Sequence, residues 1–182
     1  LCRILPGRFL YWIALRGADV SYLFDARGRE AVKSNLRQVL PNASEERIVY
    51  ETRWVFRNFA KNLTEFFRFR TFSRAFFEKR VAIKGLDWVE AARARGQGVI
   101  LLSAHLSNWE LGGAAMKILS GYKVTGVAAM HRYGPVNRLF ARERESLGLT
   151  IVDAQQAPRK VLNALRRDEV VCMIGDRAPM EH

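Results

Sequence analysis

The 182-residue chain has only two cysteines, which is too few for a disulfide framework. Cys172 stands in the apolar run 170–174, where a buried thiol is the common arrangement. The sequence has no C-x-x-C or H-E-x-x-H motif and no cluster of Cys and His, so no metal site is predicted. It also has no stretch approaching the roughly 18 uncharged apolar residues that a membrane-spanning helix requires.

Acidic residues are scarce: 18 Asp and Glu stand against 30 Lys and Arg, which gives a net charge of +12. The excess is concentrated before residue 81, where 16 basic residues face 8 acidic ones. A basic surface of this kind suits an anionic membrane, a nucleic acid or an acidic protein such as acyl carrier protein. The length predicts one structural domain with a substantial hydrophobic core.

The stretch from residue 99 to residue 114 has the most informative pattern. Residues 99–104 are a continuous apolar run, which favours a buried parallel strand. His105 follows at the carboxyl end of that strand, where chemistry usually occurs in open α/β sheets. Asn108 is a good helix N-cap, and Glu110 would occupy the first helical turn. Across this elbow Glu110 can fold back onto His105 and leave one ring nitrogen as a general base; the alternative is a structural histidine beside a capping glutamate.

The sequence H-L-S-N-W-E-L-G-G at residues 105–113 resembles the H-x4-D/E motif of glycerolipid acyltransferases, in the form found in the lipid A biosynthesis acyltransferase family. That family includes mycobacterial phosphatidylinositol mannoside acyltransferases. Similar blocks occur at residues 35–41, 136–142 and 174–177. The resemblance implies that His105 and Glu110 together deprotonate an acceptor hydroxyl, which then attacks an acyl thioester. It implies no cofactor other than the co-substrate, acyl-ACP or acyl-CoA.

Charged residues at other predicted strand ends are candidates for substrate binding, because parallel strands bring their carboxyl ends to one edge of the sheet. Arg132 follows one such strand and, with arginines on the next helix, is suited to a phosphate or anionic headgroup. Ordinary surface arginines are the alternative. With the positions that match the family blocks, the predicted substrate-binding residues are Asn108, Arg132, Asn137, Arg142, Asp176 and Arg177.

Two departures from the family pattern are visible. Ser107 stands where many members of the family have glycine, and residues 178–180 do not follow the family pattern after Asp176 and Arg177. Because members of the family extend further on both sides, we expect the sequence to be part of a longer protein.

The order of predicted elements favours an α/β fold with a mainly parallel sheet flanked by helices, over residues 81–182. Strands are expected at 81–83, 99–104, 124–130, 150–152 and 170–174, with helices at 85–95, 109–120, 135–147 and 158–167. Residues 1–80 are expected to form a basic helical region that faces a membrane, with one helix over 27–39 and another from the N-cap Ser44 to about Arg70.

Two segments of this region could lie at a membrane surface. Residues 9–15 fit either an interfacial segment or a core helix. The Phe-rich and Arg-rich segment 66–80 is predicted to be an amphipathic membrane-surface segment, with an ordinary phenylalanine core as its competitor. Stacking on single-stranded nucleic acid is less favoured, because the aromatic residues follow helical spacing.

The sequence therefore predicts a membrane-associated acyltransferase that moves an acyl group to a lipid A precursor or a related glycolipid or phospholipid. The resemblance implies a role in lipopolysaccharide biosynthesis at the cytoplasmic face of the bacterial inner membrane. The expected partners are an anionic membrane surface, acyl carrier protein or a CoA thioester, and the lipid acceptor; no nucleic acid is expected. A hydrolase that uses the same pair, and a non-catalytic membrane- or nucleic-acid-binding domain, are the alternatives.

Overall fold

A computed structural model of the chain describes residues 5–129 and 133–176. The chain forms two compact units, Leu1–Arg68 and Phe69–His182. This division lies before residue 80, where we expected the N-terminal region to end. Within the described ranges, no helix combines the length and the apolar character needed to cross a membrane.

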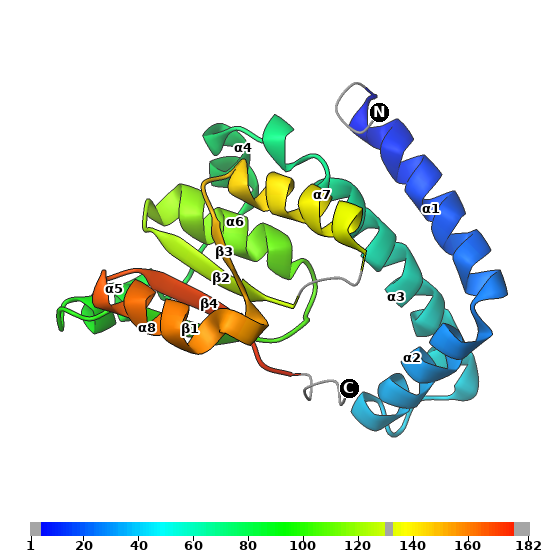
Figure 1. Cartoon of the computed structure of the whole chain (residues 1–182). Coiled ribbons are helices and arrows are strands. Elements are labelled where there is room, and N and C mark those ends of the chain that lie inside the picture. The colour runs from blue at the N-terminus through cyan, green and yellow to red at the C-terminus, as the bar shows by residue number, and fades with distance from the viewer. Residues whose placement is uncertain (1–4, 130–132, 177–182) are drawn as a thin grey trace. The chain divides into compact units, whose positions relative to one another are not determined.

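The first unit consists of three helices, α1 (Gly7–Phe24), α2 (Ala26–Val39) and α3 (Glu45–Phe66) (Figure 1). Asp25 accepts a hydrogen bond of 2.7 Å from the Gly28 amide at the start of α2. Ser44 accepts one of 3.3 Å from Arg47, which confirms it as the N-cap of α3. The third helix ends at Phe66, a few residues before the predicted end.

Helix α1 is fixed to α3 by side-chain hydrogen bonds. Asp19 accepts two from Arg57, at 2.8 and 2.9 Å, and one from Arg53 at 3.1 Å. The hydrogen bonds from Arg57 are the main cause that holds the pKa of Asp19 far below its ordinary value. Tyr11 donates to Glu65 at 2.5 Å. The three helices also enclose an apolar groove of 620 Å³.

The second unit begins with the Phe-rich segment, which forms a short 3-10 helix, η1 (Phe69–Thr71), and helix α4 (Arg74–Arg80). Phe69 and Phe77 are fully buried, and the rings of Phe72 and Phe76 stack with centroids 4.0 Å apart. The expected membrane-surface role does not fit this packing, because Phe69 and Phe77 are buried and cannot enter a membrane. The competing interpretation, a phenylalanine core, describes them correctly.

The rest of the unit is a four-stranded parallel sheet with the strand order β1-β4-β2-β3, which confirms the predicted α/β class. The expected strand at 81–83 is wrong: this segment joins no sheet within the described residues. The strands are β1 (Val99–Ser103), β2 (Val124–Ala128), β3 (Thr150–Asp153) and β4 (Val170–Ile174). The helices are α5 (Leu86–Arg93), α6 (Trp109–Ser120), α7 (Gly134–Glu145), η2 (Ala154–Gln156) and α8 (Ala157–Arg166).

Helices cover both faces of the sheet. On one face α8 contributes Val161 to a cluster with Val171 of β4. On the opposite face α5 and α6 contribute Val89 and Met116 to a cluster with Val170. Val170 and Val171 are both completely buried, because β4 lies inside the sheet and successive side chains point to opposite faces.

Strand β1 lies at the edge of the sheet, although its apolar run predicted a buried strand. Ile100 and Leu102 are 49% and 74% exposed. Both pair in register with residues on the α8 side of β4, but α8 packs over β2, β3 and β4. The apolar run therefore indicated the strand correctly and its position in the sheet wrongly.

Candidate active site

The sheet register brings His105 to Asp176. Ser103 of β1 pairs with Ile174 of β4, and His105 and Asp176 each stand two residues beyond that pair. Asp176 Oδ1 lies 2.7 Å from Nδ1 of His105, and Oδ2 accepts a 3.0 Å hydrogen bond from the His105 amide. The carboxylate thus binds both the ring and the backbone of the histidine.

These contacts define the chemistry that the ring can perform. The hydrogen bond from the His105 amide, followed by that from the ring, holds the pKa of Asp176 below its ordinary value. An ionised carboxylate at Nδ1 favours the tautomer that carries its proton there, which leaves Nε2 as a proton acceptor. Among the described residues, Nε2 of His105 has no hydrogen-bonding partner, and its side chain is 25% exposed.

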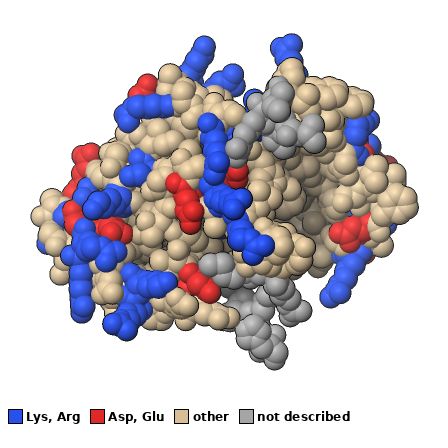
Figure 2. All heavy atoms as spheres, turned by 45° about the horizontal axis from the view of Figure 1, so that its top comes forward, with Lys and Arg blue, Asp and Glu red and all other residues tan. Residues whose placement is uncertain are grey.

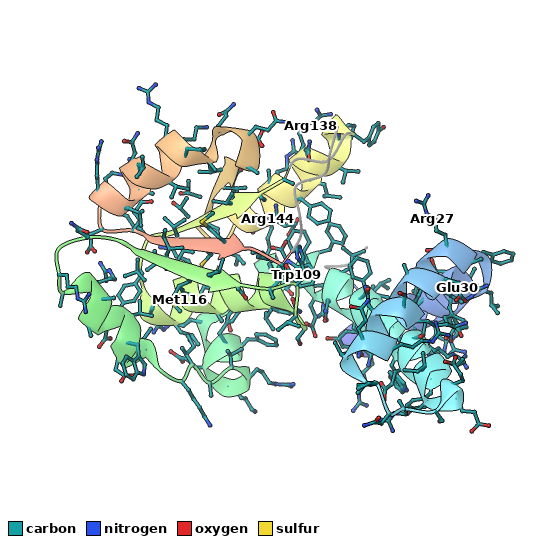
Figure 3. All side chains as sticks on the ribbon, turned by 90° about the horizontal axis from the view of Figure 1, so that it is seen from below. Arg27, Glu30, Trp109, Met116, Arg138 and Arg144 are labelled. Atoms are coloured by element: carbon teal, nitrogen blue, oxygen red, sulfur yellow. The ribbon has the colours of Figure 1, made fainter. Side chains whose placement is uncertain are left out.

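The first residue of α6 also contacts the ring. The indole of Trp109 meets the His105 imidazole edge-on, with centroids 4.9 Å apart and planes at 77°. Figure 3 shows Trp109 at the start of this helix. Asn108 Oδ1 accepts a hydrogen bond of 3.1 Å from the Leu111 amide, which confirms the predicted N-cap. Its predicted role in substrate binding stays a prediction.

Glu110 makes a different contact from the one that the motif suggested. Arg144 of α7 donates two hydrogen bonds to its carboxylate, at 2.5 and 3.1 Å, and both side chains are at least four-fifths buried. No hydrogen bond joins Glu110 to His105 in the part of the chain that the structure describes. The reason is geometric: Glu110 sits in the first turn of α6 beside α7, whereas the register places Asp176 next to the imidazole.

The other predicted site residues lie on α7 or in two segments, 130–132 and 177–182, that the structure does not describe. Asn137 is half-buried and Arg142 is exposed, on the helix that also bears Arg138 and Arg144 (Figure 3). Arg132 and Arg177 lie outside the described residues. The structure therefore joins His105 to Asp176, and leaves the substrate-binding roles of Asn137, Arg142, Asp176 and Arg177 as predictions.

Sequence reasoning missed Arg144 and Trp109 as members of this site, and it predicted Asp176 with a different role, substrate binding. The sequence does not distinguish Arg144 from the other basic residues of α7. Its role as the partner of Glu110 depends on the packing of α7 beside α6. The role of Asp176 as the carboxylate on His105 followed from strand order, since β1 and β4 are neighbours although they are far apart in sequence. Trp109 stands in the N-W-E motif, which marks it as a residue of interest. No rule of sequence spacing predicts its contact with the His105 ring.

Other reactive groups contribute little here. Burial raises the pKa of the Cys172 thiol to about 11, which makes a nucleophilic thiolate unfavourable. Within the described ranges, no three His, Cys, Asp or Glu side chains are grouped so that they could hold a metal ion. On the face shown in Figure 2, lysine and arginine side chains are more abundant than acidic ones.

A parallel sheet with helices on both faces and a carboxylate-bound histidine at its carboxyl edge defines an α/β protein equipped for acid–base chemistry. The chain matches the model of the bacterial lipid A biosynthesis acyltransferase family over residues 1–181, and it belongs to this family. It is 29% identical to a phosphatidylinositol mannoside acyltransferase of Mycobacterium tuberculosis H37Rv and to its counterpart in strain CDC 1551. Each alignment covers 93% of this chain and 56% of the relative, so the chain spans little more than half of their length.

Proposed function

We propose that the protein transfers a fatty acyl group from an acyl thioester, acyl-ACP or acyl-CoA, to a hydroxyl of a membrane lipid. The acceptor is a lipid A precursor or a related glycolipid or phospholipid. The observation that carries this proposal is the His105 ring, which Asp176 binds at Nδ1 and whose Nε2 has no partner among the described residues. Membership of the acyltransferase family and the similarity to phosphatidylinositol mannoside acyltransferases support the reaction class.

In the proposed reaction His105 acts as the general base. The acceptor hydroxyl gives its proton to Nε2 while its oxygen attacks the thioester carbonyl carbon. The carbon–sulfur bond then breaks, and the thiolate leaves with the proton from the imidazolium. Asp176 orients the ring and stabilises the imidazolium as it forms. The amide N–H groups in the first turn of α6 are suited to stabilise the oxyanion.

Glu110 belongs to the same proposal in a supporting position. Its two hydrogen bonds to Arg144 fix the first turn of α6 to α7 and so hold the segment that carries Trp109 beside the histidine. The family motif assigns the glutamate to the histidine directly, and that assignment stays a prediction beside this one. The effects of Asp176→Asn and Glu110→Gln on kcat distinguish the supporting role of Glu110 from a direct role on the histidine.

The experiment measures acyl transfer by the wild type and by His105→Ala. Acyl-ACP and acyl-CoA are supplied in parallel with bacterial lipid extract, and the lipid products are identified by mass spectrometry. We expect a histidine-dependent gain of one acyl group on a lipid, which identifies the donor and the acceptor together. Ser103→Ala is the control, because a direct transfer needs no acyl-serine and should proceed in this variant.

The other outcomes would favour the alternative functions. Thioester loss that releases only free acid would indicate a hydrolase. Equal turnover by wild type and His105→Ala would remove the histidine from the mechanism, and lipid binding without any turnover would favour a non-catalytic domain. We also propose that the protein works at a membrane surface, at the cytoplasmic face of the bacterial inner membrane, where its lipid acceptor would lie.

A further inference from the structure

Helix α1 has one face made of large apolar side chains that are exposed to solvent. The exposed fractions run from 44% for Ile13 to 83% for Phe24. The residues recur every three or four positions, so they lie on one side of the helix. This face, called the α1 apolar face below, comprises Phe9, Trp12, Ile13, Val20, Leu23 and Phe24.

The opposite side of α1 supplies the contacts within the first unit. Leu10 and Ala18 are buried there, Tyr11 donates to Glu65, and Asp19 accepts from Arg57. The α1 apolar face is therefore not needed to hold the three helices together. Isolated exposed apolar residues are normal on a protein surface, but a continuous helical face of six is typical of an interaction surface.

The charges on α1 indicate what the partner is. Arg16 lies within the α1 apolar face and is more than half exposed. The only acidic residue of the helix, Asp19, points toward α3 and is bound by Arg16, Arg53 and Arg57. The face therefore presents no unpaired carboxylate, and residues 1–68 as a whole carry 12 basic against 7 acidic residues. An anionic surface with an apolar interior matches this combination.

The aromatic residues and the groove agree with a hydrocarbon partner. The rings of Phe9 and Trp12 stack with centroids 6.0 Å apart, and tryptophan favours the boundary between headgroups and acyl chains. Gly17 and Ser21, which border the α1 apolar face, also line the apolar groove of the first unit. The apolar groove therefore lies next to the α1 apolar face.

We propose that the α1 apolar face docks the protein on an anionic lipid bilayer, with α1 lying flat in the membrane interface. This inference rests on the proposed function, because a lipid acceptor requires contact with a membrane. It places the interfacial contact on residues 9–24 and removes it from the Phe-rich segment 66–80. The helix lies on the bilayer: its apolar side chains enter the acyl boundary and Arg16 reaches the phosphate headgroups.

The test measures partition of the complete chain onto vesicles of phosphatidylcholine and phosphatidylglycerol by flotation. The variant is Trp12→Ser combined with Phe24→Ser, and the matched control is Trp88→Ser combined with Leu162→Ser. The control residues are 78% and 55% exposed on the second unit. We expect the α1 variant to lose about tenfold or more in partition, and the control to stay close to wild type.

The partition assay is combined with a check of folding and a check for dimers. Circular dichroism verifies that the variants fold, and Trp12→Ser alone replaces the double variant if that one unfolds. A double variant that floats like wild type would overturn the proposal. So would a wild-type dimer, found by sizing without lipid, that the α1 substitutions dissociate, because the face would then join two copies of the chain.

The partition assay needs no turnover, so its result stands if the acyl-transfer proposal fails. Conversely, if both proposals hold, the α1 variant keeps its activity on acceptor dispersed in detergent and loses activity on acceptor in vesicles. His105→Ala gives the reverse pattern: it floats with vesicles like wild type and shows no transfer in either medium.

Discussion

Asp176 binds His105 twice, through the ring at 2.7 Å and through the backbone amide at 3.0 Å. The two residues lie at the ends of neighbouring parallel strands, and the register alone brings them together. A carboxylate that holds both the main chain and the imidazole of one residue restricts the ring to one orientation. This relationship makes Asp176, rather than Glu110, the carboxylate that the geometry assigns to the histidine.

The first prediction compares these two carboxylates. Asp176→Asn removes the charge that selects the tautomer and stabilises the imidazolium, so we expect kcat to fall by about 10²–10⁴ with little change in KM. Glu110→Gln keeps one hydrogen bond to Arg144 and should lower kcat much less. Steady-state kinetics on one acyl thioester measures both. A larger loss for Glu110→Gln than for Asp176→Asn would favour the motif-based pairing instead.

The second prediction concerns stability and uses the Glu110–Arg144 pair. Breaking a largely buried, doubly hydrogen-bonded ion pair leaves one charge without its partner, so Glu110→Gln and Arg144→Met should each cost about 2 kcal/mol of unfolding free energy. The double variant should cost less than the sum of the two. Urea denaturation of the four proteins measures the coupling.

The exposed pair Arg74–Glu78 of α4 is the control for this cycle. Its coupling should be below about 0.5 kcal/mol, since water screens an exposed ion pair and ordering its long side chains costs entropy. Additive losses at Glu110 and Arg144 would refute the claim that the pair fixes α6 to α7.

The sequence predicted much of the second unit because the relevant signals are local. The apolar runs gave the strands at 99, 124, 150 and 170, and Asn108 gave the start of α6 from its capping chemistry. Those local signals do not predict the strand order, because the order depends on pairing between segments that are distant in sequence. As a result the sequence placed β1 inside the sheet, and it put Asp176 at the edge that carries His105 but assigned it to substrate binding.

The Phe-rich segment 66–80 shows that the sequence alone also does not decide whether apolar residues are exposed or buried. Its composition of phenylalanine and arginine is compatible with a membrane interface and with a core, and only packing separates the two. Phe69 and Phe77 are buried, whereas Phe9 and Trp12 are about half exposed on α1. For both segments the sequence left a membrane interface and a core open, because composition cannot say whether another element covers the apolar side chains.

The third prediction tests the backbone at the elbow between β1 and α6. Ser107 has φ of 51°, in the left-handed region where residues with a Cβ are strained and glycine is not. We expect Ser107→Gly to be more stable than Ser107→Ala by about 1 kcal/mol. Comparing two variants that both lack the hydroxyl isolates the backbone effect.

Ser103, at the end of β1, serves as the control for this comparison. Its backbone is an ordinary strand, so Ser103→Gly should be less stable than Ser103→Ala. Thermal or urea unfolding of the four variants measures the two differences. The same sign at both positions would mean that the left-handed conformation is not what stabilises glycine at 107.

The last prediction concerns pH and the first unit. Arg57 and Arg53 hold the pKa of Asp19 below its ordinary value, so the carboxylate stabilises the folded state fully above the pKa of an unfolded aspartate. That stabilisation is lost as the pH falls toward the lower pKa of the folded state. We expect Asp19→Asn to cost about 2 kcal/mol at pH 7 and clearly less at pH 3, measured by urea unfolding at each pH. Glu45→Gln breaks the exposed pair with Arg37 and should cost much less than Asp19→Asn at pH 7, because water screens that pair. A cost for Asp19→Asn that stays constant between pH 7 and pH 3 would show that its arginine partners do not act through the ionised carboxylate.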